Sequence, residues 1–348
     1  MTDTAADNGS FAVAARIIGP GAPVFVVAEV GINHGGDPAL CARMIEAAAG
    51  AGADAVKLQT IDPEESYVEG TASYKEFRGK ELDDDAMVGL MRLAARLGVI
   101  LFSTPGDFAS LERMVKLGMP AVKISSGLMT NLPLIAAAAR HRLPLIISTG
   151  LAYEAEIAAA VQTARDHGAP GIALLKCTAL YPSPDPSVNL AAIPTLAKRF
   201  GLPVGYSDHT LDDLACTAAV ALGATVIEKH FTLDRSLPGA DHHISLEPEA
   251  FADMVAKIRR LQAMRGDGLV RPVPQEEALR RQRHRCLVAR CDIAVGEAFT
   301  TDNVALKRPL PGRDGLPPSA FDHVMGSRAS RPLKCNDPIT DDAVARGR

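Results

Sequence analysis

The chain repeats one pattern of hydrophobic and polar positions eight times between residues 24 and 265. Each repeat has a short apolar run, a loop with polar or glycine residues, and an amphipathic stretch of helical spacing. The apolar runs predict strands over Val24–Val30, Asp54–Thr60, Val99–Pro105, Ala121–Gly127, Pro144–Gly150, Ile172–Thr178, Pro203–His209 and Thr225–Phe231. The amphipathic stretches predict helices over Pro38–Ala51, Asp84–Leu97, Phe108–Leu117, Leu132–His141, Glu154–His167, Leu190–Phe200, Asp212–Leu222 and Glu247–Arg265.

Eight strand–helix pairs within about 250 residues predict an α/β fold, a (β/α)₈ TIM barrel. A doubly wound open sheet is the alternative, and it would need a glycine-rich phosphate-binding turn after a strand. No GxGxxG motif stands at such a place in the sequence. Before the barrel, residues 11–18 alternate apolar and polar positions, which predicts a short strand or hairpin that plugs one end.

The pattern changes after the last predicted helix. Residues 1–22 are expected to form a tail and the capping hairpin, and residues 23–265 the catalytic barrel. Residues 266–283 are polar and basic with two prolines, as in a linker. Residues 284–348 show short strands and glycine turns and predict a small β-rich domain, which would dock on a partner surface because it buries little by itself.

Composition narrows the class of protein. The 348 residues carry a net charge of −4, which argues against non-specific nucleic-acid binding. No apolar run is long enough to predict a membrane span, and the first residues do not resemble a secretory signal. The six cysteines are scattered without CxxC spacing, so we expect reduced thiols in a cytoplasmic protein.

Polar and charged residues gather where the predicted strands end, the face on which such barrels build their sites. His209 and His230 end two consecutive strands, and strands about 5 Å apart can let both rings share one divalent ion with open coordination positions, such as Mn²⁺, Co²⁺ or Zn²⁺. The remaining candidates for binding a phosphate or carboxylate are Lys57, Thr104, Lys123, Ser126, Ser148 and Ser207.

Three carboxylates, Glu29, Asp208 and Asp241, are expected to act as bases or to hold sugar hydroxyls. Lys229 has the opposite parity to His230 along its strand and should face outward, while the direction of Lys176 stays open. Cys177 is expected to be a small apolar filler.

Several motifs, in order and spacing, resemble the bacterial sialic acid (nonulosonic acid) synthase family. They are AEVGINHGGD (28–37), AVKLQT (55–60), FSTP (102–105), VKISSG (122–127), STG (148–150), LLKCTALYPSP (174–184), GYSDHT (205–210) and IEKHFTLDRSLPGADH (227–242). The segment VGEAFTTDNVALKRP (295–309) is similar to the antifreeze-like SAF domain that follows the barrel in that family.

The resemblance implies a transferase that condenses phosphoenolpyruvate with an N-acetylated hexosamine, either N-acetylmannosamine or a 2,4-diacetamido-trideoxyhexose. The product would be a nine-carbon 2-keto sugar acid plus phosphate. It implies that His209 and His230 hold a divalent metal of the Mn²⁺ type, with Co²⁺ or Mg²⁺ as alternatives, and that Glu29 and Lys123 act with them in catalysis. The residues implied to bind phosphoenolpyruvate are Lys57, Thr104, Lys123, Ser126, Ser148 and Ser207.

The same resemblance implies that Glu29, Gln59, Tyr181 and Asp241 contact the sugar. Arg308, in the small domain, would reach the sugar site of the other subunit in a domain-swapped homodimer. Two positions depart from the family pattern: Leu128 stands where an acidic residue is common, and Ala179 where Asn or Ser is common. The segment LPGADHHISLEP favours a neuraminate or legionaminate product, whereas LLKCTALYP favours a pseudaminate.

Two other functions stay open at this point. Lys123 or Lys176 at a strand end could be the nucleophile of a Schiff-base aldolase. Alternatively, Leu128 and Ala179 could mark a catalytically decayed synthase that binds a glycan or a protein partner.

Overall fold

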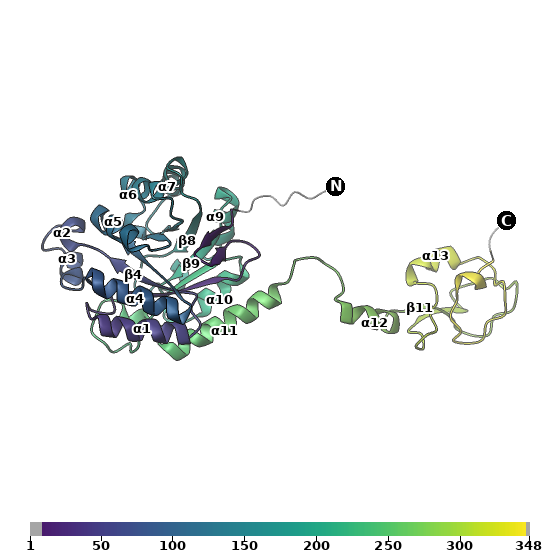
Figure 1. Cartoon of the computed structure of the whole chain (residues 1–348). Coiled ribbons are helices and arrows are strands. Elements are labelled where there is room, and N and C mark those ends of the chain that lie inside the picture. The colour runs from purple at the N-terminus through teal and green to yellow at the C-terminus, as the bar shows by residue number, and fades with distance from the viewer. Residues whose placement is uncertain (1–8, 346–348) are drawn as a thin grey trace. The chain divides into compact units, whose positions relative to one another are not determined.

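The computed structural model describes residues 9–345, apart from the side chains of residues 278 and 281. Residues 1–8, most of the predicted N-terminal tail, lie outside that range. The chain divides into two compact units, residues 1–266 and 267–348 (Figure 1).

The N-terminal unit is a closed barrel of eight parallel strands in the order β10-β3-β4-β5-β6-β7-β8-β9. This confirms the predicted barrel and excludes the open sheet. The strands are β3 (Phe25–Gly31), β4 (Ala55–Thr60), β5 (Ile100–Pro105), β6 (Val122–Ile124), β7 (Leu145–Ser148), β8 (Ile172–Cys177), β9 (Val204–Asp208) and β10 (Val226–His230). β6 ends before its predicted limit because the chain turns into a short 3₁₀ helix, η1 (Ser126–Leu128).

All eight predicted helices are present around the barrel (Figure 1). They are α1 (Pro38–Gly50), α4 (Asp84–Leu97), α5 (Phe108–Leu117), α6 (Leu132–Arg140), α7 (Glu154–Asp166), α9 (Ala192–Phe200), α10 (Leu214–Ala221) and α11 (Pro248–Arg265). Asp37 caps α1 as predicted, accepting a hydrogen bond from the Ala39 amide. Gly98 ends α4 in the left-handed region at φ 74°, which a residue without Cβ adopts at little cost.

Sequence periodicity did not predict three short helices in the loops at the carboxyl ends of the strands. They are α2 (Pro63–Ser66), α3 (Ala72–Phe77) and α8 (Asp185–Val188). Each is two turns or less, too short to show a helical period, and α2 and α3 are held by side-chain caps from Asp62 and Thr71.

The predicted hairpin plugs the barrel at the amino ends of its strands. β1 (Phe11–Val13) and β2 (Arg16–Ile18) pair antiparallel. Phe11, Val13 and Ile18 pack in one buried cluster with inward-facing residues such as Phe25 and Phe102. A separate, larger apolar cluster lies between the outer surface of the strands and the helices. The interior is therefore apolar at the plugged end and leaves the carboxyl end for polar residues.

The C-terminal unit has an apolar core of its own, made of residues such as Leu287, Phe299 and Leu333. The stretch predicted as a linker contains a helix, α12 (Pro274–Arg283). Two strands then pair antiparallel, β11 (Cys286–Ala289) and β12 (Val304–Lys307), and isolated bridges join the loops around them. Short helical turns complete the unit: η3 (Pro318–Ala320), α13 (Phe321–Val324) and η4 (Asp341–Ala343).

All six cysteines are free thiols. Within residues 9–345, no helix is both long and apolar enough to cross a membrane.

Candidate active site

Four charged side chains point into the barrel just above the apolar layer. Glu29 on β3, Lys57 on β4, Lys123 on β6 and Glu228 on β10 are each at most 5% exposed. Each lies two residues after an inward apolar residue of the same strand, so the two-residue repeat of a strand directs it inward as well. Charges this deep carry a high desolvation cost unless they are paired, which makes their pairing informative.

The four groups form one connected ion-pair cluster. Lys57 Nζ lies 2.7 Å from Glu29 Oε2 and 3.8 Å from Glu228 Oε1. Lys123 Nζ lies 3.7 Å from the same Glu228 oxygen. Glu228 therefore neutralises both lysines in part, whereas Glu29 pairs with Lys57 alone.

The surroundings separate the two carboxylates by their pKa. Burial raises the pKa of Glu29 to about 7, although Lys57 opposes the shift. Burial also acts to raise the pKa of Glu228, but Lys123 and Lys57 outweigh it and hold that pKa below its usual range. Glu228 is thus a fixed anion at neutral pH, whereas Glu29 can gain or lose a proton there. Burial lowers the pKa of Lys123, against the pull of Glu228.

Hydroxyl groups line the lysines. Lys57 Nζ donates to Thr104 Oγ1 at 3.3 Å, and Lys123 Nζ donates to Ser148 Oγ at 2.6 Å. Ser207 Oγ donates to Glu228 Oε1 at 3.1 Å, and Ser126 Oγ accepts from the Gly150 amide at 3.1 Å. The structure brings all six residues of the predicted anion site to the carboxyl end of the barrel.

His209 and His230 meet at the ends of β9 and β10, with ring centroids 5.2 Å apart. The two rings come close because β9 and β10 are parallel neighbours in the barrel, paired from Tyr206 and Ile227 to Asp208 and Lys229. His209 Nδ1 lies 2.8 Å from the Thr178 carbonyl oxygen, which can only accept, so Nδ1 carries the proton and Nε2 is left as a lone-pair donor.

The donor set fits a divalent ion with open coordination positions. Nδ1 of His230 is buried and has no hydrogen-bond partner, and burial holds the pKa of this ring well below its usual value, which favours the neutral, ligating form. Asp241 Oδ2 lies 3.7 Å from that nitrogen. In the part of the chain described here, no three His, Cys, Asp or Glu side chains are preorganised as a metal site. The protein would therefore supply few ligands, unlike a structural zinc centre.

The predicted sugar contacts in the barrel lie around the same point. Gln59 Nε2 donates to Glu29 Oε1 at 2.9 Å. The Tyr181 ring stacks on His209 with centroids 4.0 Å apart, and its side chain is half exposed at the mouth of the barrel. Arg308 belongs to the C-terminal unit, which is described by itself, and its side chain is exposed there.

Asp208 was wrongly predicted as an active-site carboxylate. Its neighbours Ser207 and His209 face inward, so Asp208 faces the helices, and the register of β9 and β10 sets it opposite Lys229. Lys229 Nζ lies 2.6 Å from Asp208 Oδ2, and both side chains are fully buried. The outward direction predicted for Lys229 is confirmed, and the pair holds β9 to β10 from outside the site.

Lys176 also lies outside the barrel interior. Its Nζ donates to the Cys177 carbonyl and to Thr178 Oγ1, and the inward positions of β8 are Ala173 and Leu175 instead. Leu128 packs, half buried, on the apolar layer beneath the helices, so it brings no acid to the site.

Glu228 is the site residue that sequence reasoning passed over. It lies two residues before His230, so both side chains face the same side of the strand, and the sequence alone could have predicted this. Cys177 was interpreted as a filler, yet its Sγ lies 3.9 Å from His209 Nδ1, at the wall of the site.

Comparisons with known proteins agree with the sequence motifs. The NeuB family model matches residues 44–269, and the SAF domain model matches residues 284–345. An N,N'-diacetyllegionaminic acid synthase of Legionella pneumophila is 37% identical over 333 residues, 90% of this chain and 93% of that protein. A pseudaminic acid synthase of Helicobacter pylori is 34% identical over 338 residues, 93% of this chain and 98% of that protein.

Among solved structures, an N-acetylneuraminic acid synthetase of Leptospira borgpetersenii, in complex with citrate, matches with a TM-score of 0.74. It is 36% identical, and the match covers 77% of this chain and 94% of that one.

Proposed function

The chain belongs to the NeuB family, and from this membership and the buried cluster we propose that it condenses phosphoenolpyruvate with an N-acetylated amino-sugar aldehyde. The products would be a nine-carbon 2-keto sugar acid and phosphate. One observation carries the proposal: two buried lysines lined with hydroxyls lie beside two histidines and a carboxylate whose pKa is near 7. The relatives' names support the reaction class and leave the sugar undecided.

The lysine side of the site would bind phosphoenolpyruvate. Lys57 and Lys123 offer two ammonium groups that share the Glu228 carboxylate, so when Glu29 is protonated an incoming anion can take up the remaining charge. Hydroxyls of Thr104, Ser126, Ser148 and Ser207 would complete the contacts to phosphate and carboxylate oxygens. Charge-assisted bonds in a dry site are stronger than the same bonds in water, which explains why the barrel buries them.

His209 and His230 would hold the divalent metal, Mn²⁺ in our proposal, with Co²⁺ or Mg²⁺ as alternatives. When bound, such an ion polarises the sugar aldehyde for attack. Thr178 fixes the ring of His209 through its carbonyl, and the Tyr181 ring covers the same histidine. These contacts preorganise both the ring and its tautomer, as a second layer around a metal site does.

The atoms balance as follows. C3 of phosphoenolpyruvate forms a bond to the aldehyde carbon, water adds at C2, and the C2–O bond to phosphate breaks to leave a C2 carbonyl. Of the two water protons, one ends on the former aldehyde oxygen and the other on the released phosphate. Glu29 would take the proton of the attacking water, because its pKa lets it ionise at neutral pH. Lys57, at 2.7 Å from Glu29, would hold Glu29 as the carboxylate before it takes that proton, and would stabilise the departing phosphate.

Arg308 would complete the sugar site of a second copy in a domain-swapped homodimer. The segments that follow β7 and β9 at the carboxyl end of the barrel carry exposed large apolar side chains: Leu151 is 78% exposed and Tyr153 81%, before α7, and Leu214 is 70% exposed at the start of α10. Exposed apolar groups at the rim of a charged site favour a protein cover. The small domain of another copy is the cover that we propose. The cytoplasmic location stays a prediction.

The test is phosphate release from phosphoenolpyruvate by the purified full-length protein, with Mn²⁺ and a panel of amino sugars. Release with at least one amino sugar, and its loss on adding a chelator, would support the proposal. A Schiff-base aldolase is the second candidate, favoured by the lowered pKa of Lys123. Trapping of a covalent adduct by borohydride, together with activity that survives chelation, would establish the aldolase instead.

A further inference from the structure

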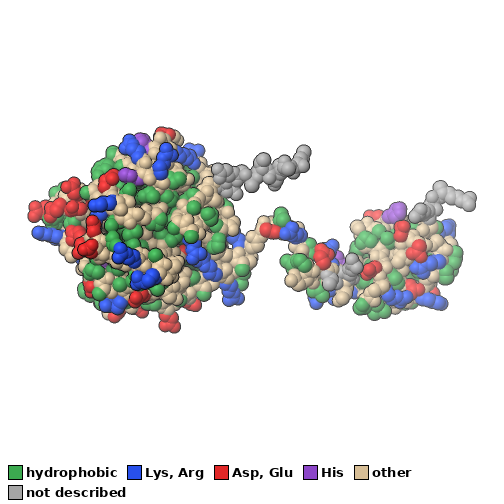
Figure 2. Space-filling model, viewed as in Figure 1, with side chains coloured by type: hydrophobic (Ala, Val, Ile, Leu, Met, Phe, Trp, Pro, Cys, Tyr) green, Lys and Arg blue, Asp and Glu red, His purple; other side chains and the backbone are tan. Residues whose placement is uncertain are grey.

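The buried ion pair of Asp208 and Lys229 lies directly behind the two histidines of the proposed metal site. Asp208 precedes His209 on β9, Lys229 precedes His230 on β10, and the two are partners in the register of these strands. Successive side chains of a strand point to opposite faces, so the pair lies outside the barrel and the imidazoles lie inside it, one residue later. Figure 2 shows charged side chains over the surface of the barrel unit, and this pair is not among them because both side chains are fully buried.

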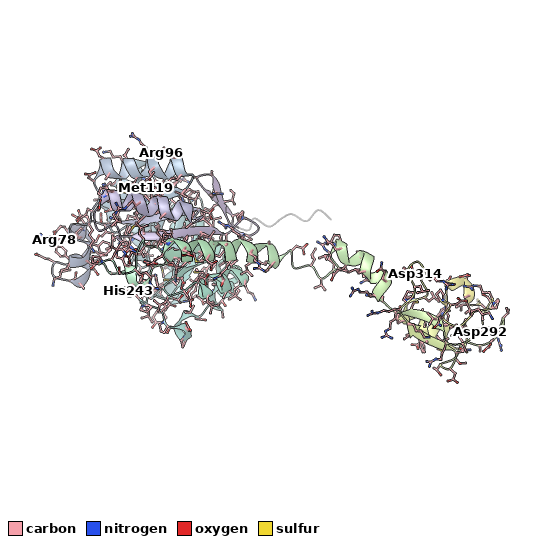
Figure 3. All side chains as sticks on the ribbon, turned by 90° about the horizontal axis from the view of Figure 1, so that it is seen from below. Arg78, Arg96, Met119, His243, Asp292 and Asp314 are labelled. Carbon is pink, nitrogen blue, oxygen red and sulfur yellow. The ribbon has the colours of Figure 1, made fainter. Side chains whose placement is uncertain are left out.

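The Asp208 carboxylate is held by several hydrogen bonds. Its Oδ1 accepts from the Tyr206 hydroxyl and from the Thr210 amide, both at 2.9 Å. Its Oδ2 accepts from Lys229 Nζ at 2.6 Å, from Thr210 Oγ1 at 2.9 Å and from Cys216 Sγ, on α10, at 3.3 Å. Helix α10 covers β9 and β10 and packs in turn against α11, the long green helix of the barrel unit in Figure 3. A carboxylate whose bonds are complete in such a dry place is rigid, so Asp208 is a fixed point of β9.

Lys229 connects the two strands beyond the ion pair itself. Its Nζ also donates to the Thr210 carbonyl oxygen at 2.5 Å. Asp208 thus binds the backbone amide of Thr210, and Lys229 binds the carbonyl of the same residue. His209 lies between these two anchored residues, Asp208 and Thr210. Because Lys229 directly precedes His230, its ammonium group links the backbone at one imidazole to the backbone at the other.

The position of the His230 ring depends on this backbone link more than that of the His209 ring does. His209 Nδ1 is held by the Thr178 carbonyl oxygen at 2.8 Å. Nδ1 of His230, in contrast, is buried and has no hydrogen-bond partner. The backbone of β10 must therefore place the His230 ring, and Lys229 is the residue that ties this part of β10 to β9.

We propose that Asp208 and Lys229, here called the outer ion pair, are positioning residues that hold the two imidazoles at the spacing a divalent ion needs. The ring centroids lie 5.2 Å apart. Metal–ligand distances tolerate deviations of only about 0.2 Å, so a slight slip of β10 against β9 would weaken binding. The inference rests on the metal centre of the proposed function and adds two residues that touch neither metal nor substrate. Neutral side chains of similar size often replace a buried ion pair without loss of stability, so stability alone does not account for these charges.

The test replaces the outer ion pair by a neutral pair of similar size, Asp208→Asn with Lys229→Met, in the full-length protein. Calorimetry with Mn²⁺ alone should give a Kd at least tenfold higher than that of the wild type, because loss of the groups that orient metal ligands typically costs tenfold to a hundredfold in affinity. With saturating Co²⁺, the visible absorption bands of this double variant should shift, because they report the geometry of the ligands.

The matched control neutralises an ion pair at the other end of the barrel. Arg259 Nη2 lies 2.6 Å from Asp54 Oδ2, just before β4, and both side chains are at least partly buried. Asp54→Asn with Arg259→Met should keep the wild-type Kd for Mn²⁺ and the wild-type Co²⁺ spectrum. A rise in Kd as large as that of the other double variant would overturn the proposal, because it would show a general effect of losing a buried pair.

Thermal melting in a chelating buffer shows whether each variant folds. Tyr206→Phe removes one donor to Asp208 while keeping the ion pair and the apolar ring. It should raise the Kd for Mn²⁺ roughly threefold or more, because one hydrogen bond of the network is lost. An unchanged Kd in the folded Asp208→Asn/Lys229→Met protein would overturn the proposal. If that protein does not fold, an unchanged Kd in Tyr206→Phe would do so.

The result also separates this inference from the proposed function, because the Kd is measured without substrate. Tight Mn²⁺ binding with no phosphate release from any amino sugar would overturn the synthase and leave the outer ion pair to be judged by the Kd values. A wild type that binds neither Mn²⁺ nor Co²⁺ would overturn the outer ion pair together with the metal centre. Phosphate release that persists in chelator would in that case leave the condensation itself standing.

Discussion

Replacing Glu29 by Gln should stabilise the protein at alkaline pH while removing its activity. The folded protein keeps the Glu29 proton up to about pH 7, whereas the unfolded chain loses it near the ordinary value of 4.5. The unfolded state therefore binds fewer protons between these values, and the free energy of unfolding falls as the pH rises through them. The difference corresponds to about 3 kcal/mol above pH 7, at roughly 1.4 kcal/mol per pH unit. Gln cannot ionise, so the variant escapes this loss.

Thermal unfolding, followed by circular dichroism, measures this difference in stability. A chelating buffer keeps metal ions from contributing to it. Glu29→Gln should melt roughly 5–10 °C above the wild type at pH 8 and close to it at pH 4. Glu65→Gln, at an exposed position of α2, is the control and should follow the wild type at both pH values. Its kcat should stay unchanged, whereas Glu29→Gln should lose roughly a hundredfold or more if Glu29 is the base. A Glu29→Gln protein that melts at or below the wild type at pH 8 would refute the assignment of a raised pKa to this carboxyl.

Three other perturbations test the remaining parts of the site. Lys123→Met removes an ammonium that donates to Ser148 Oγ at 2.6 Å, and calorimetry should show the affinity for phosphoenolpyruvate falling about tenfold to a hundredfold; unchanged binding would exclude Lys123 from the anion site. His230→Ala should abolish Mn²⁺ binding and phosphate release, whereas His141→Ala, a partly exposed histidine paired with Glu112, should retain both. Arg308→Ala and Glu29→Gln subunits should each be inactive alone and regain activity when mixed, because one mixed dimer site would be intact. Failure of mixing to restore activity, with dimers confirmed by light scattering, would contradict the swap.

The barrel could be predicted from the sequence because its signals are local and repeated. Each strand run is short, apolar and followed by a helix of matching period, so eight independent signals agree on one architecture. The strand ends were less predictable. The alternation of side chains along a strand correctly placed Lys229 outside the barrel and His230 inside. It was not applied to Asp208, which lies between the inward-facing Ser207 and His209 and must therefore face outward. In a polar motif such as Ser207-Asp208-His209, the inward and outward side chains must therefore be told apart before roles are assigned.

The environment of each group could not be predicted, because it depends on contacts between distant strands. Nothing local distinguishes Glu29 from Glu228, because each lies two residues before the end of a buried strand. Their pKa values differ because Glu228 lies between two lysines, whereas Glu29 has one.

The inward-facing residues of the barrel form two layers: an apolar layer that stabilises the fold and a charged layer that would bind the substrate. Phe25, Ala55, Ala121 and Val226 pack against the hairpin plug, and Lys57, Lys123 and Glu228 follow two residues later on the same face of their strands. The apolar layer gains free energy on burial, and the charged layer costs free energy unless its pairs are complete. An anionic substrate would pair with the charges that remain unpaired, so its binding would offset part of the desolvation free energy of burying them. Substitutions in the charged layer can therefore raise stability as they remove function, whereas substitutions among the plug residues should lower stability and leave the charges in place. Glu29→Gln, compared with a truncation such as Phe11→Ala, would expose this difference in one melting experiment.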